Sequence, residues 1–145
     1  MKHVLIDEET RVVQWDDYFK YLESVRAAFT EELYSYVSDW SNYSLDSKTS
    51  LHDAWLMGVH FGLQEREITI EWLSAHQDRK LILRYCGVES YNVDLSVGYR
   101  KGDRDVLAHE FRVSDKSIVH EIAFNSRNRI VIVFQTAIPT VEVLQ

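Results

Sequence analysis

The large apolar residues among the first fifty positions follow a helical period. Seven of them succeed one another at steps of three or four: Tyr18, Leu22, Val25, Phe29, Leu33, Tyr36 and Trp40. This spacing places them on one face of an α-helix. Asp16 or Asp17 can cap its start. We therefore expect one helix of about 25 residues, with Thr30 as the place for a break because few globular helices run so long.

From residue 51 onward the hydrophobic period is two, which is typical of strands with one buried face. Three consecutive segments alternate around Val59, Ile70 and Leu83. A tight turn at 62–65 would pair Val59 with Ile68, and a loop at 74–79 would set Trp72 against Leu81 and Ile70 against Leu83. Apolar residues then face apolar residues in both pairs of strands.

The alternation continues to the end of the chain through segments at 91–95, 107–113 and 118–124. Residues 129–134 are apolar on both faces, which favours a central strand. The pattern predicts an α+β fold. A long N-terminal α-helix would pack on an antiparallel β-meander of about six or seven strands, and the meander can curl into a partial barrel.

Length and composition narrow the class of protein. The 145 residues fit a single domain, 1–145, with a helical part and connector at 1–50 and the sheet at 51–145. A net charge of −7 disfavours nucleic-acid binding. One cysteine excludes an intramolecular disulfide, and we find no apolar stretch suited to a signal peptide or a membrane helix. We expect a soluble, cytoplasmic protein without membrane contact.

The sequence carries none of the common enzyme signatures. It contains no glycine-rich phosphate loop, no dinucleotide-binding fingerprint, no nucleophile elbow and no zinc-protease motif. We therefore expect a protein that is not an enzyme and that needs no cofactor.

Two histidines in the second half are weak candidates for a metal or acid–base site. A turn at 114–117 would place Phe111 opposite His120 and His109 opposite Ile122, so that the two imidazoles become diagonal neighbours on one face. Such a pair can share a metal ion or a proton. The commoner arrangement is a buried, hydrogen-bonded imidazole on an apolar face, and we favour it.

A second group of residues is predicted to take part in binding. His52 and Asp53 lie where the polar connector meets the first strand, a position that also suits capping of backbone groups. The remaining candidates are two tyrosines that the periodicity does not explain and the one basic cluster: Tyr91, Tyr99, Arg100, Lys101 and Arg104. Exposed aromatic and basic side chains are common anchors at protein interfaces.

Three motifs carry a family resemblance over residues 51–134. The sheet opens with Leu51-His52-Asp53-Ala54, the third strand ends in Tyr85-Cys86-Gly87-Val88, and residues 120–124 and 130–134 read His-Glu-Ile-Ala-Phe and Ile-Val-Ile-Val-Phe. In these motifs the chain resembles a loose group of small bacterial domains of unknown function. Some similar small acidic domains accompany polymorphic toxins as immunity proteins. The resemblance supplies no catalytic residues.

Three functions are compatible with these observations. The first is a non-catalytic protein-binding module, such as a bacterial immunity or antitoxin-like protein that blocks a basic toxin, because an acidic surface steers basic partners. The second is a small histidine-dependent enzyme or metal-binding protein. The third is a self-associating structural domain, for instance a homodimer joined through sheet edges.

Overall fold

The computed structural model describes residues 1–96 and 105–145, and these residues form a mostly β molecule. They contain two short α-helices, α1 (Asp16–Ser24) and α2 (Glu31–Val37), and the 3-10 turns η1 (Arg26–Ala28) and η2 (Trp40–Asn42). Ten strands form three sheets: β1 (Leu5–Ile6), β2 (Val13–Gln14), β3 (Trp55–Gly62), β4 (Glu67–Leu73), β5 (Arg79–Cys86), β6 (Ser90–Val93), β7 (Val106–Ser114), β8 (Ser117–Phe124), β9 (Arg129–Phe134) and β10 (Thr136–Val143).

The prediction of an α+β fold with a long N-terminal helix on a single meander is therefore wrong. The helical spacing of the apolar residues is present, but the α-helix ends at Ser24, the 3-10 turn η1 follows, and the chain is extended at Phe29. Thr30 then starts a new helix, because its side chain accepts a hydrogen bond from the backbone N–H of Leu33 at 3.2 Å. The stripe is thus divided between two helices of nine and seven residues.

The strands form two four-stranded antiparallel sheets in place of one meander. The first sheet has the order β10-β5-β4-β3 and the second has the order β6-β9-β8-β7. The predicted pairs of Trp72 with Leu81 and Ile70 with Leu83 are confirmed. The predicted pair of Val59 with Ile68 is wrong, because the turn covers residues 63–66, so Gly62 lies opposite Glu67 and Val59 lies opposite Ile70.

The chain moves between the two sheets at two bends that lie side by side. It enters the second sheet between β5 and β6 and returns to the first between β9 and β10. Gln135 N–H donates to the carbonyl of Cys86 at 3.1 Å, so the two ladders are nearly continuous across the bend. Gly87 has φ +65°, and a Cβ there would lie 2.6 Å from Cγ of Gln135, so only glycine suits this position.

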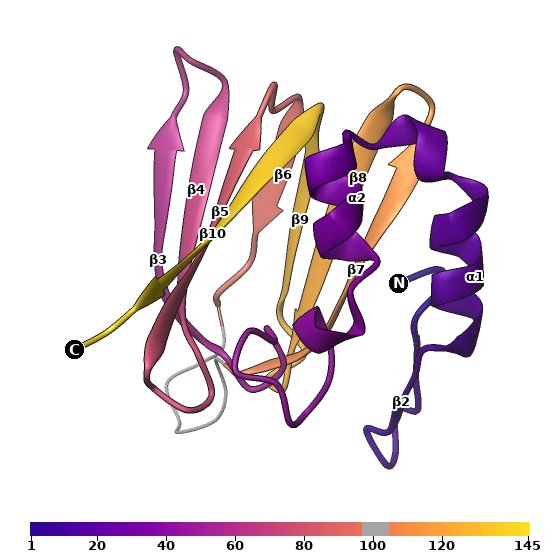
Figure 1. Cartoon of the computed structure of the whole chain (residues 1–145), viewed down its shortest axis with the longest axis vertical. Helices are drawn as coiled ribbons and strands as arrows, with labels where there is room; N and C mark the ends of the chain where they lie inside the picture. Colours follow the sequence, from indigo (N-terminus) through magenta and orange to yellow (C-terminus); the bar gives the residue numbers. More distant parts are fainter. Residues whose placement is uncertain (97–104) are drawn as a thin grey trace.

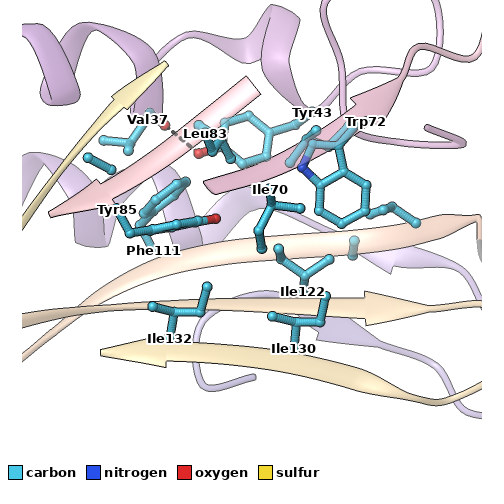
Figure 2. Packing of buried hydrophobic residues seen from close by; sticks show 14 of the residues in the cluster. Val37, Tyr43, Ile70, Trp72, Leu83, Tyr85, Phe111, Ile122, Ile130 and Ile132 are labelled. Carbon is cyan, nitrogen blue, oxygen red and sulfur yellow. Dashed lines mark hydrogen bonds between the residues drawn. The ribbon is translucent and has the colours of Figure 1, made fainter. Parts of the chain in front are cut away.

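The core lies between the inner faces of the two sheets and extends beneath the helices. Figure 2 shows Ile70, Leu83 and Tyr85 of the first sheet above Ile122, Ile130 and Ile132 of the second, with Phe111 beside Tyr85. All of these side chains are buried. Tyr43, from the segment after η2, joins the same core and donates a hydrogen bond to the carbonyl of Val37 at 2.6 Å (Figure 2).

The helices cover one side of this structure and leave the other uncovered. In Figure 1, α1 lies beside β7 and α2 lies in front of the second sheet, while β3 forms the opposite margin of the molecule. α2 also contacts β10. Within the described residues, no helix has the length and apolar character that a membrane span requires.

Candidate functional site

The edge of β7 is closed by the first helix. The backbone N–H groups of Phe111 and Val113 donate to the hydroxyls of Tyr18 and Tyr21, at 2.9 and 2.7 Å. Both tyrosines lie on α1, and β7 is the outer strand of its sheet. An edge strand with free N–H groups is a template for pairing with another chain. We call this side the closed flank, because these bonds occupy the donors that a docking strand would need.

His52 and Asp53, predicted as binding residues, join the start of β3 to the start of β7. His52 Nδ1 lies 2.8 Å from the carbonyl oxygen of Leu107, so Nδ1 carries the proton and donates. Asp53 N–H donates to the carbonyl of Val106 at 2.9 Å, and Asp53 has φ +58°. His52 Nε2 lies 3.5 Å from the Asp53 carboxylate. The structure therefore brings the two residues together, and His52 serves as a connection between strands.

His109 and His120 lie in direct contact inside the core. His109 Nε2 is 3.1 Å from the carbonyl oxygen of Asn42, and a carbonyl only accepts, so this nitrogen carries the proton. His109 Nδ1 must then accept from His120 Nε2–H, at 2.9 Å. His120 Nδ1 in turn accepts from the hydroxyl of Tyr85, at 2.7 Å. Every polar atom of this Tyr85–His120–His109–Asn42 chain is satisfied when both imidazoles are neutral.

The surroundings favour this neutral state. Burial lowers the pKa of His109 to about 4 and holds the pKa of His120 well below its ordinary value. Burial also raises the pKa of the Tyr85 phenol well above its usual range. The ring of Phe111 stacks on His120 with centroids 3.8 Å apart, and Tyr43 stacks on His109 at 4.5 Å.

This geometry argues against a metal or catalytic role for the two histidines. Their relative exposures are 1% and 0%, so neither faces solvent or a substrate. The nitrogens that face each other share a proton, so a metal ion would have to break the chain to bind there. In the described part of the chain, no group of three or more metal-ligating side chains gathers around a common point.

The glutamates that follow these histidines point to the opposite face of the second sheet and hold the N-terminal segment there. Glu110 is completely buried, and its carboxylate accepts hydrogen bonds from the backbone N–H groups of residues 2, 3 and 4 at 2.8 to 2.9 Å. Glu121 bonds Arg112 at 2.6 Å. Burial alone would raise the pKa of the Glu121 carboxyl, but the hydrogen bond and charge of Arg112, together with the charges of the N-terminus and Arg129, lower it. Strand alternation could have found this separation of histidine from glutamate, although no signal in the sequence indicated the bound segment.

The side of the molecule away from the helices carries exposed apolar side chains. Apart from one bridge between Trp55 and Asp105, β3 pairs only with β4 in the described part of the chain, and β6 pairs only with β9. The two edges approach each other where the rings of Phe61 and Tyr91 lie 5.1 Å apart. We call β3, the turn at 63–66 and β6 the open flank. Its exposed apolar residues are Trp55, Met57, Phe61, Leu63 and Tyr91.

Negative charge surrounds the open flank. β4 and the short segments that adjoin β3 and β6 contain six carboxylates and one guanidinium: Asp53, Glu65, Glu67, Glu71, Glu89, Asp94 and Arg66. Glu71 is neutralised in part by Lys80, whose Nζ lies 3.5 Å away. The other five carboxylates have no lysine or arginine partner among the described residues. An apolar edge with acidic surroundings suits a partner that brings both apolar and basic side chains.

Five predicted binding residues thus fall into two groups. Tyr91 lies on the open flank beside Phe61, a contact that no pattern in the sequence indicates. Tyr99, Arg100, Lys101 and Arg104 lie outside the described residues. The apolar part of the open flank was missed, because the alternation of β3 predicts an inward face and does not reveal that, among the described residues, no further strand or helix covers its edge.

Comparison with known proteins assigns no family to this chain. No family model matches the sequence, and no curated protein matches it. Among solved structures, the crystal structure of an uncharacterized protein from Neisseria gonorrhoeae is similar at a TM-score of 0.47 and 14% sequence identity. The match covers 64% of this chain and 93% of that one.

Proposed function

We propose that this protein is a non-catalytic protein-binding module that receives a basic, extended segment of a partner along the open flank. The observation that carries the proposal is the asymmetry of the two flanks. α1 occupies the edge of β7 through the Tyr18 and Tyr21 hydroxyls, whereas β3 and β6 leave large apolar side chains about half exposed. Contiguous exposed apolar side chains commonly mark interaction sites.

Strand addition is the recognition mode that an uncovered sheet edge favours. Backbone hydrogen bonds supply affinity in this mode, and pockets for alternate side chains supply specificity. The carboxylates around the open flank favour lysine or arginine at the outward positions of the added strand. They also disfavour a second copy of this chain, because pairing two open flanks would bring the same negative charges together.

A bacterial toxin with a basic surface is the partner that the resemblance in sequence implies. In that case the module would act in the cytoplasm as an immunity protein, and blocking would require only stoichiometric binding. The histidine-dependent enzyme is the weaker candidate, because His109 and His120 are buried and bonded to each other.

Two matched peptides test the proposal. One alternates valine with lysine and the other alternates valine with glutamate, each about eight residues long, the length of an edge strand. We expect fluorescence anisotropy to show binding of the lysine peptide only. Phe61→Thr should weaken this binding about tenfold, since buried aromatic anchors dominate interface energies.

Leu45→Thr is the matched control, because Leu45 is 68% exposed and belongs to the connector, not to the open flank. It should leave the affinity unchanged. Equal binding of both peptides, or equal loss in the two variants, would contradict the proposal. If light scattering shows that the free protein is a dimer and Phe61→Thr dissociates that dimer, the open flank binds a second copy of this chain instead.

A further inference from the structure

A groove lies between the second helix and the first sheet, at the β10 end of that sheet and away from the open flank. α2, η2 and the connector form one wall, and β5 and β10 form the other. Figure 1 shows α2 next to the upper part of β10. The groove encloses about 420 Å³, a size typical of sites for small molecules.

The two walls differ in chemistry. The sheet side presents the accessible apolar side chains of Pro139 and Val141, and the almost completely buried Leu81 and Leu83 complete its lining. The helical side presents Tyr36 and Asp39. Sites for small ligands commonly combine an apolar lining with a few polar groups that fix the orientation of the ligand.

Tyr36 and Asp39 retain unused hydrogen-bonding capacity. The Tyr36 hydroxyl makes no hydrogen bond to any residue that the structure describes, although its ring packs edge-on against Phe111 at 6.1 Å. Asp39 Oδ1 accepts from the backbone N–H of Ser41 at 2.9 Å, and the second carboxylate oxygen has no partner within the described residues. Tyr36 and Asp39 both line this groove, so the two groups can act on one ligand.

The negative charge of Asp39 favours a cationic ligand in the groove. None of the described residues that line it is a lysine, arginine or histidine, so nothing there would compensate an anionic ligand. A cationic head would meet the Asp39 carboxylate and could donate to the Tyr36 hydroxyl. A charge-assisted hydrogen bond of this kind is stronger than a neutral one.

We propose that this groove is a binding site for a small molecule with an ammonium head and an apolar body. The ammonium group binds between Asp39 and Tyr36, and the body packs on Pro139 and Val141. This site is independent of the open flank, so it holds whether or not the module binds a protein.

Isothermal calorimetry at pH 7 with three probes of similar shape tests this proposal. The probes are 2-phenylethylamine, 2-phenylethanol and 3-phenylpropionate. We expect the amine to bind at least about tenfold more tightly than the alcohol, the difference that a hydrogen bond to a charged group supplies. The propionate should bind more weakly than either. Equal affinities for the three probes, or no heat from the amine, would overturn the proposal.

Conservative variants locate the site. Asp39→Asn removes the charge but keeps an oxygen for Ser41 N–H, so the thermal midpoint should stay near that of the wild type while amine affinity falls about tenfold. Tyr36→Phe should weaken the amine more than the alcohol. Asp46→Asn, at an exposed position of the same connector, should change nothing. Unchanged amine binding in Asp39→Asn would place the amine elsewhere and overturn the assignment.

Discussion

At the residue scale, the neutral histidine pair determines how the protein responds to acid. The pKa of His109 lies at about 4 in the folded state, below the ordinary value of 6.5. The unfolded chain therefore takes up protons first as the pH falls through 6.5, and stability is lost progressively down to the folded pKa. His120 acts in the same direction. Protonation of either imidazole therefore lowers the free energy of unfolding.

We predict that the free energy of unfolding falls between pH 7 and pH 5, before most carboxylates titrate. For His109 alone the full loss by pH 4 is about 3 kcal/mol. Urea unfolding at pH 7, 6 and 5 measures this slope. His109→Gln should be less stable at pH 7 but should show a flatter slope, whereas His60→Gln, at an exposed position, should keep the wild-type slope. An unchanged slope in His109→Gln would refute the assignment.

Tyr85 supplies the last donor of the buried chain. Tyr85→Phe would leave His120 Nδ1 without a hydrogen bond in the core, which should cost about 1–3 kcal/mol. Chemical denaturation measures the loss. Tyr91→Phe is the matched control, since Tyr91 is exposed on β6. A change below the error of the measurement in Tyr85→Phe would mean that water replaces the phenol.

At the element scale, the bend at Gly87 joins the two sheets. Gly87→Ala places a Cβ at positive φ and 2.6 Å from Gln135, and we expect a loss of about 1–3 kcal/mol. Gly62→Ala is the control, because the nearest contact of its Cβ is the mobile end of Glu65 at 3.3 Å. Thermal unfolding of the two variants checks the difference, and equal midpoints would contradict it.

The backbone N–H groups of residues 2–4 are all bonded to one buried carboxylate, that of Glu110. Glu110→Gln keeps the shape of the side chain but replaces one acceptor oxygen by a donor, which cannot bond the backbone N–H groups at 2–4. We expect faster amide hydrogen exchange at residues 2–4 and a lower thermal midpoint. Glu142→Gln, at an exposed position of β10, should change neither. Unchanged exchange at 2–4 would show that Glu110 does not hold the segment.

Some elements could be predicted because local pattern and tertiary pairing agree. Strands β4, β5, β8 and β9 have clear alternation or apolar runs, and short connections fix their partners, so the pairs of Ile70 with Leu83 and His120 with Phe111 follow from the sequence. The helix length could not be predicted from its apolar stripe, because a stripe continues across a break when both helices bury the same face. Only the side-chain cap of Thr30 distinguishes the two cases.

At the scale of the whole molecule, the division into two sheets leaves no mark in the hydrophobic pattern. It depends on one positive φ at Gly87 and on the crossing at Gln135, while the strands on either side alternate as they would in a single meander. The candidate site is likewise not visible in the hydrophobic pattern. The position of α1 determines which strand edge is covered. The sequence of β3 does not indicate where α1 packs.

The open flank also predicts how binding should respond to salt. Because the surrounding carboxylates are exposed or half-buried, their attraction for a basic segment is screened at high ionic strength. We expect the association rate of the lysine–valine peptide to fall steeply between low and physiological salt, with a smaller change in the dissociation rate. Stopped-flow measurements separate the two rates. A salt-independent association rate would contradict the role of charge.

The central question is which edge of the protein receives its partner. A heteronuclear NMR titration with the lysine–valine peptide answers this question by residue. We predict that the largest amide shifts lie on β3 and β6, around Phe61 and Tyr91, while the amides of Phe111 and Val113 on the closed flank stay unchanged. Shifts confined to β7, to β10 or to no common surface would contradict the proposal that the open flank is the docking site.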